Sequence, residues 1–136
     1  MNWGRFALAA LAAGVVASFT DWLFMGVLFH AKYNAYPEVW RKSVASGADG
    51  KAVAWSTVLG LVTCSAFIFT CQRLHLYNYD TTLKLALAVW VIAPLPIVIT
   101  NALFIKMHPA LVFSHSLGWL AKLVVAALAV VLILAR

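Results

Sequence analysis

The sequence predicts an all-α integral membrane protein, a bundle of four transmembrane helices. Of the 136 residues, 65% are hydrophobic and only 10% are charged. Soluble domains have about a quarter charged residues and less than half apolar ones, so lipid is the expected solvent for this chain. Four apolar stretches each reach about 20 residues, the length that a helix needs to cross a bilayer. The sequence has no short alternating segments of the kind that build a membrane barrel.

The four apolar stretches divide the chain evenly, and polar connections separate them. The expected spans are residues 6–30, 52–71, 85–105 and 110–135. The longest connection is a loop over residues 31–51, and the polar stretch 72–84 and the turn 106–109 are shorter. Helices are the expected structure because they satisfy every backbone hydrogen bond internally. One membrane domain, residues 1–136, then accounts for the whole chain.

Two prolines, Pro94 and Pro96, fall within the third expected span. Proline lacks a backbone donor and clashes with the preceding helical turn, so a kink is expected there. Broken membrane helices also occur at transport sites, and a functional break is therefore the alternative interpretation.

Basic residues give the chain a formal net charge of +6, and they lie at the ends of the spans, where they can meet lipid headgroups. One membrane face receives Lys32, Arg41, Lys42, Lys51 and Lys106, and the other receives Arg5, Arg73, Lys84 and Arg136. This near balance does not assign an orientation by the positive-inside rule. Nothing in the pattern resembles a nucleic-acid-binding surface, so no nucleic-acid partner is expected.

An intramembrane polar cluster is the main candidate for a site. It consists of Asp21, Asn101 and Lys122, with Thr20 and Thr100 beside the first two. A charge in the bilayer centre costs at least about 2.5–3.5 kcal/mol, and the rise of a helix places these residues at similar depths. We therefore expect an Asp21–Lys122 ion pair with Asn101 as a bridge. A structural pair, a proton or ion relay, and contact with another subunit remain the alternative roles.

Three histidines, His30, His108 and His115, are expected on the side of the long loop. Imidazole ligands suit copper or haem, so a metal or haem site is one hypothesis for these residues. No short ligand spacing such as HxxxH occurs, and hydrated interfacial histidines are the simpler interpretation. His115 also shares one helix face with Trp119 and Lys122, because these residues are spaced at i, i+4 and i+7.

Aromatic and charged residues in the long loop indicate an ordered turn at the membrane interface. They are Tyr33, Tyr36, Glu38, Trp40 and Arg41. Pro37 disfavours a helical conformation at Tyr36, and tyrosine and tryptophan favour the headgroup level.

Small residues line one face of the first expected span. Ala10, Gly14 and Ala17 lie near i, i+4 and i+7, a spacing that allows another helix to approach closely. Either packing within the bundle or oligomerisation would explain this stripe.

The chain shows signs of an internal repeat. Residues 20–24 (TDWLF) align with residues 100–104 (TNALF), and residues 54–55 align more weakly with residues 118–119. Each half would be a helical hairpin in the same orientation, which is typical of two parallel repeats.

Aromatic and apolar motifs along almost the whole chain resemble a family of small bacterial membrane proteins known as DUF1761. The motifs are residues 1–3 (MNW), 22–29 (WLFMGVLF), Tyr36, 40–41 (WR), 100–104 (TNALF) and 115–119 (HSLGW). The resemblance implies a four-helix fold in the bacterial inner (cytoplasmic) membrane and implies no activity. The family often has an aromatic or apolar residue where this chain has Asp21.

The sequence favours a non-enzymatic function through assembly, as a homo-oligomer or an accessory subunit of a larger membrane complex. No nucleophile with its base, phosphate loop or paired carboxylates is apparent. The expected partners are lipid and either the protein itself or other membrane subunits, and no cofactor is expected. One alternative is a small transporter or proton- or ion-conducting protein that uses Asp21, Asn101 and Lys122. A further alternative is a haem- or copper-binding redox protein that uses the histidines.

Overall fold

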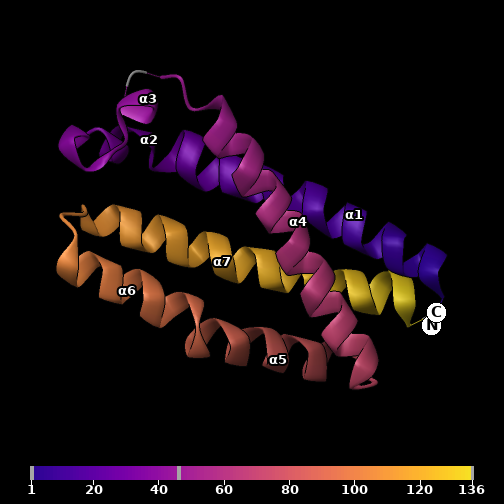
Figure 1. Ribbon diagram of the computed structural model, residues 1–136. Coiled ribbons are helices and arrows are strands. Elements are labelled where there is room, and N and C mark those ends of the chain that lie inside the picture. Colours follow the sequence, from indigo (N-terminus) through magenta and orange to yellow (C-terminus); the bar gives the residue numbers. More distant parts are fainter. Residues whose placement is uncertain (1, 46, 136) are drawn as a thin grey trace.

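The computed structural model describes residues 2–45 and 47–135, and these residues form helices and connections without any strand (Figure 1). Four helices are long and apolar enough to cross a membrane. They are Trp3–Leu28, Gly50–Arg73, Tyr79–Phe104 and Pro109–Leu134. The predicted all-α bundle of four spans is therefore confirmed, and the chain is a multi-pass integral membrane protein.

Several spans combine two helical segments. The first consists of α1 (Trp3–Asp21) and the π-helix η1 (Trp22–Leu28), and the second is α4 (Gly50–Arg73). The third consists of α5 (Tyr79–Ile92) and α6 (Pro94–Phe104), and the fourth of α7 (Pro109–Ala129) and the π-helix η3 (Val130–Leu134). The long loop contains three short helices, α2 (His30–Tyr33), η2 (Pro37–Val39) and α3 (Lys42–Ala45).

The third span begins earlier than the sequence analysis predicted, at Tyr79 and not at residue 85. Asn78 acts as the N-cap of α5, and its side-chain oxygen accepts a 2.9 Å hydrogen bond from the backbone N–H of Thr81. Asp80 then pairs with Lys84 one turn later, at 2.8 Å on the exposed surface. The polar residues that indicated a loop are thus the capped first turn of the helix.

The expected kink in the third span is confirmed. The helix stops at Ile92, and a new helix starts at Pro94. The intervening Ala93 has non-helical backbone angles, with φ −125° and ψ −69°. Proline suits the first position of a helix because it lacks the N–H that would stay unsatisfied there. Figure 1 shows the resulting bend between α5 and α6.

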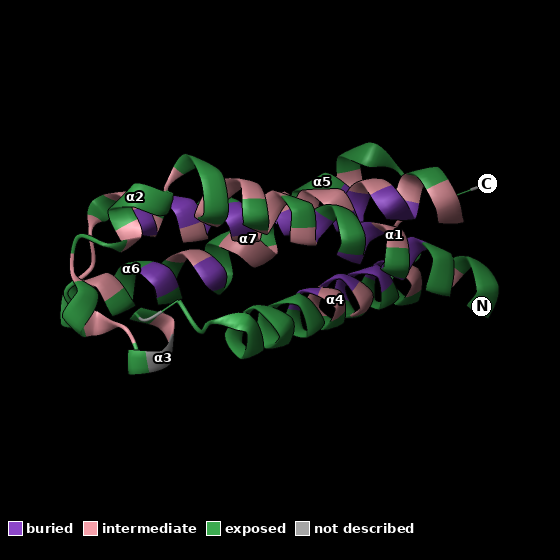
Figure 2. Cartoon of the chain, turned by 90° about the horizontal axis from the view of Figure 1, so that it is seen from above, coloured by how far each residue is buried: buried purple, intermediate pink, exposed green. Residues whose placement is uncertain are grey.

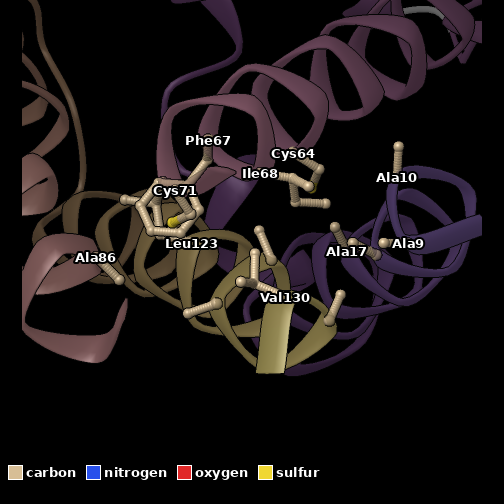
Figure 3. Close-up of a cluster of buried hydrophobic side chains, with 14 residues drawn as sticks. Ala9, Ala10, Ala17, Cys64, Phe67, Ile68, Cys71, Ala86, Leu123 and Val130 are labelled. Carbon is tan, nitrogen blue, oxygen red and sulfur yellow. The ribbon is translucent and has the colours of Figure 1, made fainter. Parts of the chain in front are cut away.

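Helix α7 lies at the centre of the bundle and contacts α1, α4, α5 and α6. In the most apolar part of the fourth span 39% of the residues are buried, against 17–22% in the other three spans. The core between these helices combines small and branched side chains (Figure 3). It includes Ala13 and Ala17 of α1, Ile68 of α4 and Leu123 of α7.

The small-residue stripe of α1 packs inside the bundle. Ala10, Gly14 and Ala17 are all buried. A Cβ atom on Gly14 would lie 2.7 Å from Cδ1 of Leu61 on α4, so the two helices approach too closely for a larger residue. Internal packing therefore explains this stripe, and oligomerisation is not needed to explain it.

Two parts of the bundle have little cover from the rest of the chain. Residues 51–59 of α4 are all exposed, whereas the second half of that helix contacts the core (Figure 2). In α6 only Pro94 and Val98 are buried. The rest of the described chain therefore leaves these surfaces uncovered.

Both chain ends lie at the same end of the bundle, as an even number of spans requires (Figure 1). We expect cysteines introduced at the exposed positions Ala48 and Leu74 to face opposite sides of the membrane. A membrane-impermeant maleimide should label only one of the two variants in intact cells, and both after permeabilisation. The native thiols, Cys64 and Cys71, are buried and should give little background. Labelling of both variants in intact cells would contradict the four-span topology.

Candidate functional site: a buried ion pair beneath an aromatic cap

Among the residues that the structure describes, one ion pair lies inside the bundle. Nζ of Lys122 on α7 lies 2.8 Å from Oδ2 of Asp21, the last residue of α1, and the side chains are only 9% and 14% exposed. A lone charge in this apolar interior would be strongly unfavourable, whereas the pair neutralises both groups. The predicted partnership of the first and fourth spans is thus present in the structure.

Two glycines form walls of this ion pair. A Cβ atom on Gly118 would lie 3.2 Å from Oδ1 of Asp21, which is tighter than an ordinary contact. A Cβ atom on Gly60 would lie 3.9 Å from Nζ of Lys122, an ordinary van der Waals distance. Trp119 covers the cation, with its ring centroid 4.9 Å from Nζ of Lys122. The carboxylate therefore has less room than the ammonium group.

An aromatic cap lies on the loop side of the ion pair, and we define it as Tyr33, Trp40 and His115. The rings of Tyr33 and Trp40 stack at 5.5 Å, and Nε1 of Trp40 donates a 2.7 Å hydrogen bond to the Tyr33 carbonyl. The Tyr33 hydroxyl shares hydrogen bonds of 3.3 Å with Oγ of Ser114 and with Nε2 of His115. These contacts attach the loop to α7 at positions eight and seven residues before Lys122.

The charge of Asp21 influences the aromatic cap. Burial raises the pKa of the Tyr33 hydroxyl, the hydrogen bond with Ser114 lowers it, and the negative charge of Asp21 raises it again. The net effect is a raised pKa, so Tyr33 stays neutral at physiological pH and can donate one hydrogen bond. The cap therefore lies close enough to Asp21 for the carboxylate charge to act on Tyr33.

The opposite side of the ion pair is apolar. Cys64 and Ile68 of α4 pack there with Leu123 and Ala126 of α7, and all four are at most 2% exposed. The Cys64 thiol approaches the Lys122 carbonyl at 4.0 Å. The ion pair is therefore bounded by the aromatic cap on the loop side and by apolar side chains on the opposite side.

Asn101 does not bridge the ion pair, so that expectation is wrong. The kink at Ala93 gives α6 a separate direction, and Asn101 is exposed on its surface. Thr100 is exposed beside it, and Thr20 donates a 2.8 Å hydrogen bond to the Ala17 carbonyl of its own helix. One buried oxygen of the pair, Oδ1 of Asp21, accepts no hydrogen bond within the described residues.

The three histidines that could have formed a metal or haem site have separate roles. His30 is exposed, and Nδ1 of His108 accepts a 3.1 Å hydrogen bond from the Ala110 N–H as the N-cap of α7. His115 belongs to the aromatic cap. Throughout the part of the chain that the structure describes, no three His, Cys, Asp or Glu side chains are grouped to bind a metal ion.

The loop is attached to the bundle a second time through Lys106. Its Nζ lies 3.0 Å from Oε1 of Glu38 and 4.6 Å from the centroid of the Tyr36 ring. A backbone hydrogen bond and the bond from Lys106 hold the pKa of Glu38 below its usual value. Arg41 is exposed, and its carbonyl accepts the first hydrogen bonds of α3. The predicted interfacial residues are therefore ordered, but exposed pairs of this kind contribute little stability.

Sequence reasoning missed the two glycine walls and the attachment of Tyr33 to α7. The spacing of His115, Trp119 and Lys122 had indicated a shared face, and the structure places the cap and the cation along it. No sequence signal connected Tyr33 to that face, because the two are separated by 82 residues in the chain.

Comparisons with known proteins found no matching family model, no matching curated protein and no matching solved structure. The resemblance to the DUF1761 family stays a prediction.

The ion pair can be tested by a double-mutant cycle. Lys122→Met alone leaves Asp21 buried without a partner, and we expect a loss of about 3–5 kcal/mol in the free energy of unfolding. Asp21→Asn combined with Lys122→Met should recover much of that loss, since a neutral replacement of a buried pair is often harmless. Denaturant unfolding in micelles would measure the cycle. Single-mutant losses that simply add in the double mutant would show that the residues are not partners.

The glycine walls allow a matched comparison. Gly118→Ala should destabilise the protein by about 1–3 kcal/mol, as overpacking does, because Asp21 cannot move away without lengthening its contact with Lys122. Gly60→Ala should be nearly neutral, since the added methyl group only reaches ordinary contact with Lys122. Thermal unfolding of both variants measures the difference. Equal effects of the two substitutions would argue against a tightly held carboxylate.

Proposed function

We propose that this integral membrane protein works by assembly and that it forms a homo-oligomer through the outer face of α6. The observation that carries the proposal is the exposed amide of Asn101 within a transmembrane helix. Ile97, Asn101 and Phe104 are spaced at i, i+4 and i+7, so they share one helix face. Ile97 is 58% exposed and Phe104 is 86% exposed, which leaves the amide within an apolar stripe.

The chemistry of an amide favours a second copy of this chain as the occupant of that face. One asparagine side chain carries both donors and acceptors. Two copies related by a two-fold axis can therefore bond Asn101 to Asn101, and the flanking apolar residues would meet their own equivalents. Such a contact would form near the loop-side end of α6, since Asn101 lies about 4.5 Å, less than one helical turn, from that end.

The internal ion pair supports the same view. Asp21 and Lys122 neutralise each other inside one chain, so they do not need an outside partner. On the side away from the loop, the pair is followed by buried apolar side chains such as Ile68 and Leu123. A bundle with a dry core and exposed helix faces suits an assembling subunit better than a conducting one. An accessory subunit of a larger complex is the closest alternative, with an unrelated chain on α6.

A second candidate function is a proton or ion relay based on Asp21. The observation that favours it is Oδ1 of Asp21, which is buried and accepts no hydrogen bond among the described residues, with the titratable Tyr33 and His115 on the loop side. If the relay exists, proton flux into proteoliposomes should depend on Asp21 and should disappear in Asp21→Asn combined with Lys122→Met. Flux that equals that of protein-free liposomes would exclude this function.

The assembly proposal predicts an effect of Asn101→Leu. One interhelical hydrogen bond in a membrane is worth about 0.6–2 kcal/mol, so a symmetric Asn101 pair should make the wild-type oligomer several-fold tighter than the variant. The mass of the detergent-extracted particle, measured over a range of protein concentrations, reports this difference. Thr100→Val is the matched control, because it removes a neighbouring polar group from a different face of the same helix.

Three results would contradict this proposal. A wild-type protein that is monomeric and stable in several mild detergents would exclude the oligomer. If Asn101→Leu and Thr100→Val weaken the oligomer equally, or if neither weakens it, the Asn101 amide is not part of the contact. Copurification of unrelated subunits in fixed proportion would support the accessory role instead.

A further inference from the structure

A pocket of about 390 Å³ lies at the membrane face opposite the long loop. It forms where the first span begins, where the second and fourth spans end, and along the connection to the third. Its lining residues are Asn2, Arg5, Gln72, Arg73, His75, Tyr77 and Leu134. Figure 1 shows these segments gathered at the end of the bundle where both chain ends lie. The pocket therefore lies at the level of the lipid headgroups.

The lining is basic and rich in hydrogen-bonding groups. Arg5 and Arg73 contribute two guanidinium groups from different helices, and none of the described residues that line the pocket is acidic. A guanidinium group matches the geometry of phosphate oxygens and can bind two of them at once. Asp80, the acid nearest in sequence to this connection, is bound to Lys84 at 2.8 Å. The pocket thus presents positive charge suited to an anion.

Two side chains of the lining, Gln72 and Leu134, indicate more than a simple anion site. Oε1 of Gln72 is buried and accepts no hydrogen bond from the described residues, so a donor such as a ligand hydroxyl would satisfy it. His75 adopts a left-handed conformation, with φ 55°, in the connection that forms the rim. Leu134 adds an apolar side chain at the end of η3. Phosphate, hydroxyl and hydrocarbon groups would each find a complementary surface.

We propose that this pocket binds the phosphodiester headgroup of an anionic phospholipid that carries hydroxyl groups, as phosphatidylglycerol does. Arg73 contacts the phosphate, Arg5 adds positive charge to the same pocket, Gln72 accepts a hydrogen bond from a headgroup hydroxyl, and the acyl chains continue along the apolar surface of the bundle. A soluble phosphate compound shares the anionic chemistry, but it would gain nothing from the adjoining lipid-facing surface. The site is separate from the ion pair and from the α6 face.

The proposal can be tested with purified, delipidated full-length protein by native mass spectrometry. Phosphatidylglycerol is titrated against the wild type, Arg73→Gln and Lys84→Gln, with phosphatidylcholine as the zwitterionic comparison. Arg73→Gln should weaken phosphatidylglycerol binding about fivefold or more, the effect of losing one basic contact. Lys84→Gln removes the same charge from the same membrane face outside the pocket and should leave the affinity nearly unchanged.

A second variant tests the headgroup. Gln72→Leu should weaken binding of phosphatidylglycerol and leave binding of phosphatidic acid, which lacks the glycerol headgroup, unchanged. Glycerol phosphate added as a competitor should displace no lipid at equal concentration. Displacement at equal concentration would identify a site for soluble phosphates and overturn the lipid assignment.

Other outcomes also overturn the proposal. Equal affinities for phosphatidylglycerol and phosphatidylcholine would exclude an anion site. If Arg73→Gln and Lys84→Gln weaken lipid binding equally, the loss of affinity comes from general surface charge and not from the pocket. An unchanged affinity in both Arg73→Gln and Gln72→Leu would exclude the pocket itself.

Discussion

The bundle depends on the pairing of two charges that hydrocarbon does not tolerate separately. Asp21 ends the α-helical part of the first span, and Lys122 lies in the middle of the central helix. Their contact at 2.8 Å fixes how far α1 and α7 can slide or rotate relative to each other. The lost hydration of both groups offsets most of their attraction, so the pair contributes little net stability. Its main effect is to make one arrangement of the helices far more favourable than its neighbours, because every other register would separate the charges.

Close packing of small residues makes this contact possible. The alanines and Gly14 of α1 allow α4 and α7 to approach, and Gly118 leaves room for the carboxylate itself. Above the pair, the aromatic cap of Tyr33, Trp40 and His115 attaches the long loop to α7 and separates the charges from the loop-side surface. Below it, branched and small side chains exclude water. In lipid no hydrophobic force holds helices together, so packing and polar contacts of this kind decide the structure.

The sequence predicted the fold well because hydropathy and length respond directly to the thickness of a bilayer. It also predicted the ion pair, since two isolated charges at similar depths have few other ways to be accommodated. The role assigned to Asn101 was wrong, although the sequence estimate had placed it at a depth similar to that of the pair. The position of a residue along a helix does not determine which side of the helix it faces. In addition, the break at Ala93 changes the direction of the helix axis, so that α6 does not continue the line of α5. The sequence also did not predict the aromatic cap or the basic pocket, because each combines residues from distant segments of the chain. For the pocket, the occurrence of Arg5 and Arg73 on the same membrane face was the one available signal.

The central claim is that Asp21 and Lys122 are in direct contact inside the bilayer. Solid-state NMR of the protein in lipid bilayers can measure it, by the dipolar coupling between ¹⁵N-labelled Nζ of Lys122 and ¹³C-labelled Cγ of Asp21. The structure predicts a strong coupling, as an N–O separation of 2.8 Å requires, and a chemical shift typical of an ionised carboxylate. The Asp21→Asn variant lacks this carboxylate, so the signal that disappears in the variant is assigned to Asp21. A coupling too weak for direct contact, or a protonated Asp21, would contradict the ion pair and with it the helix register that depends on it.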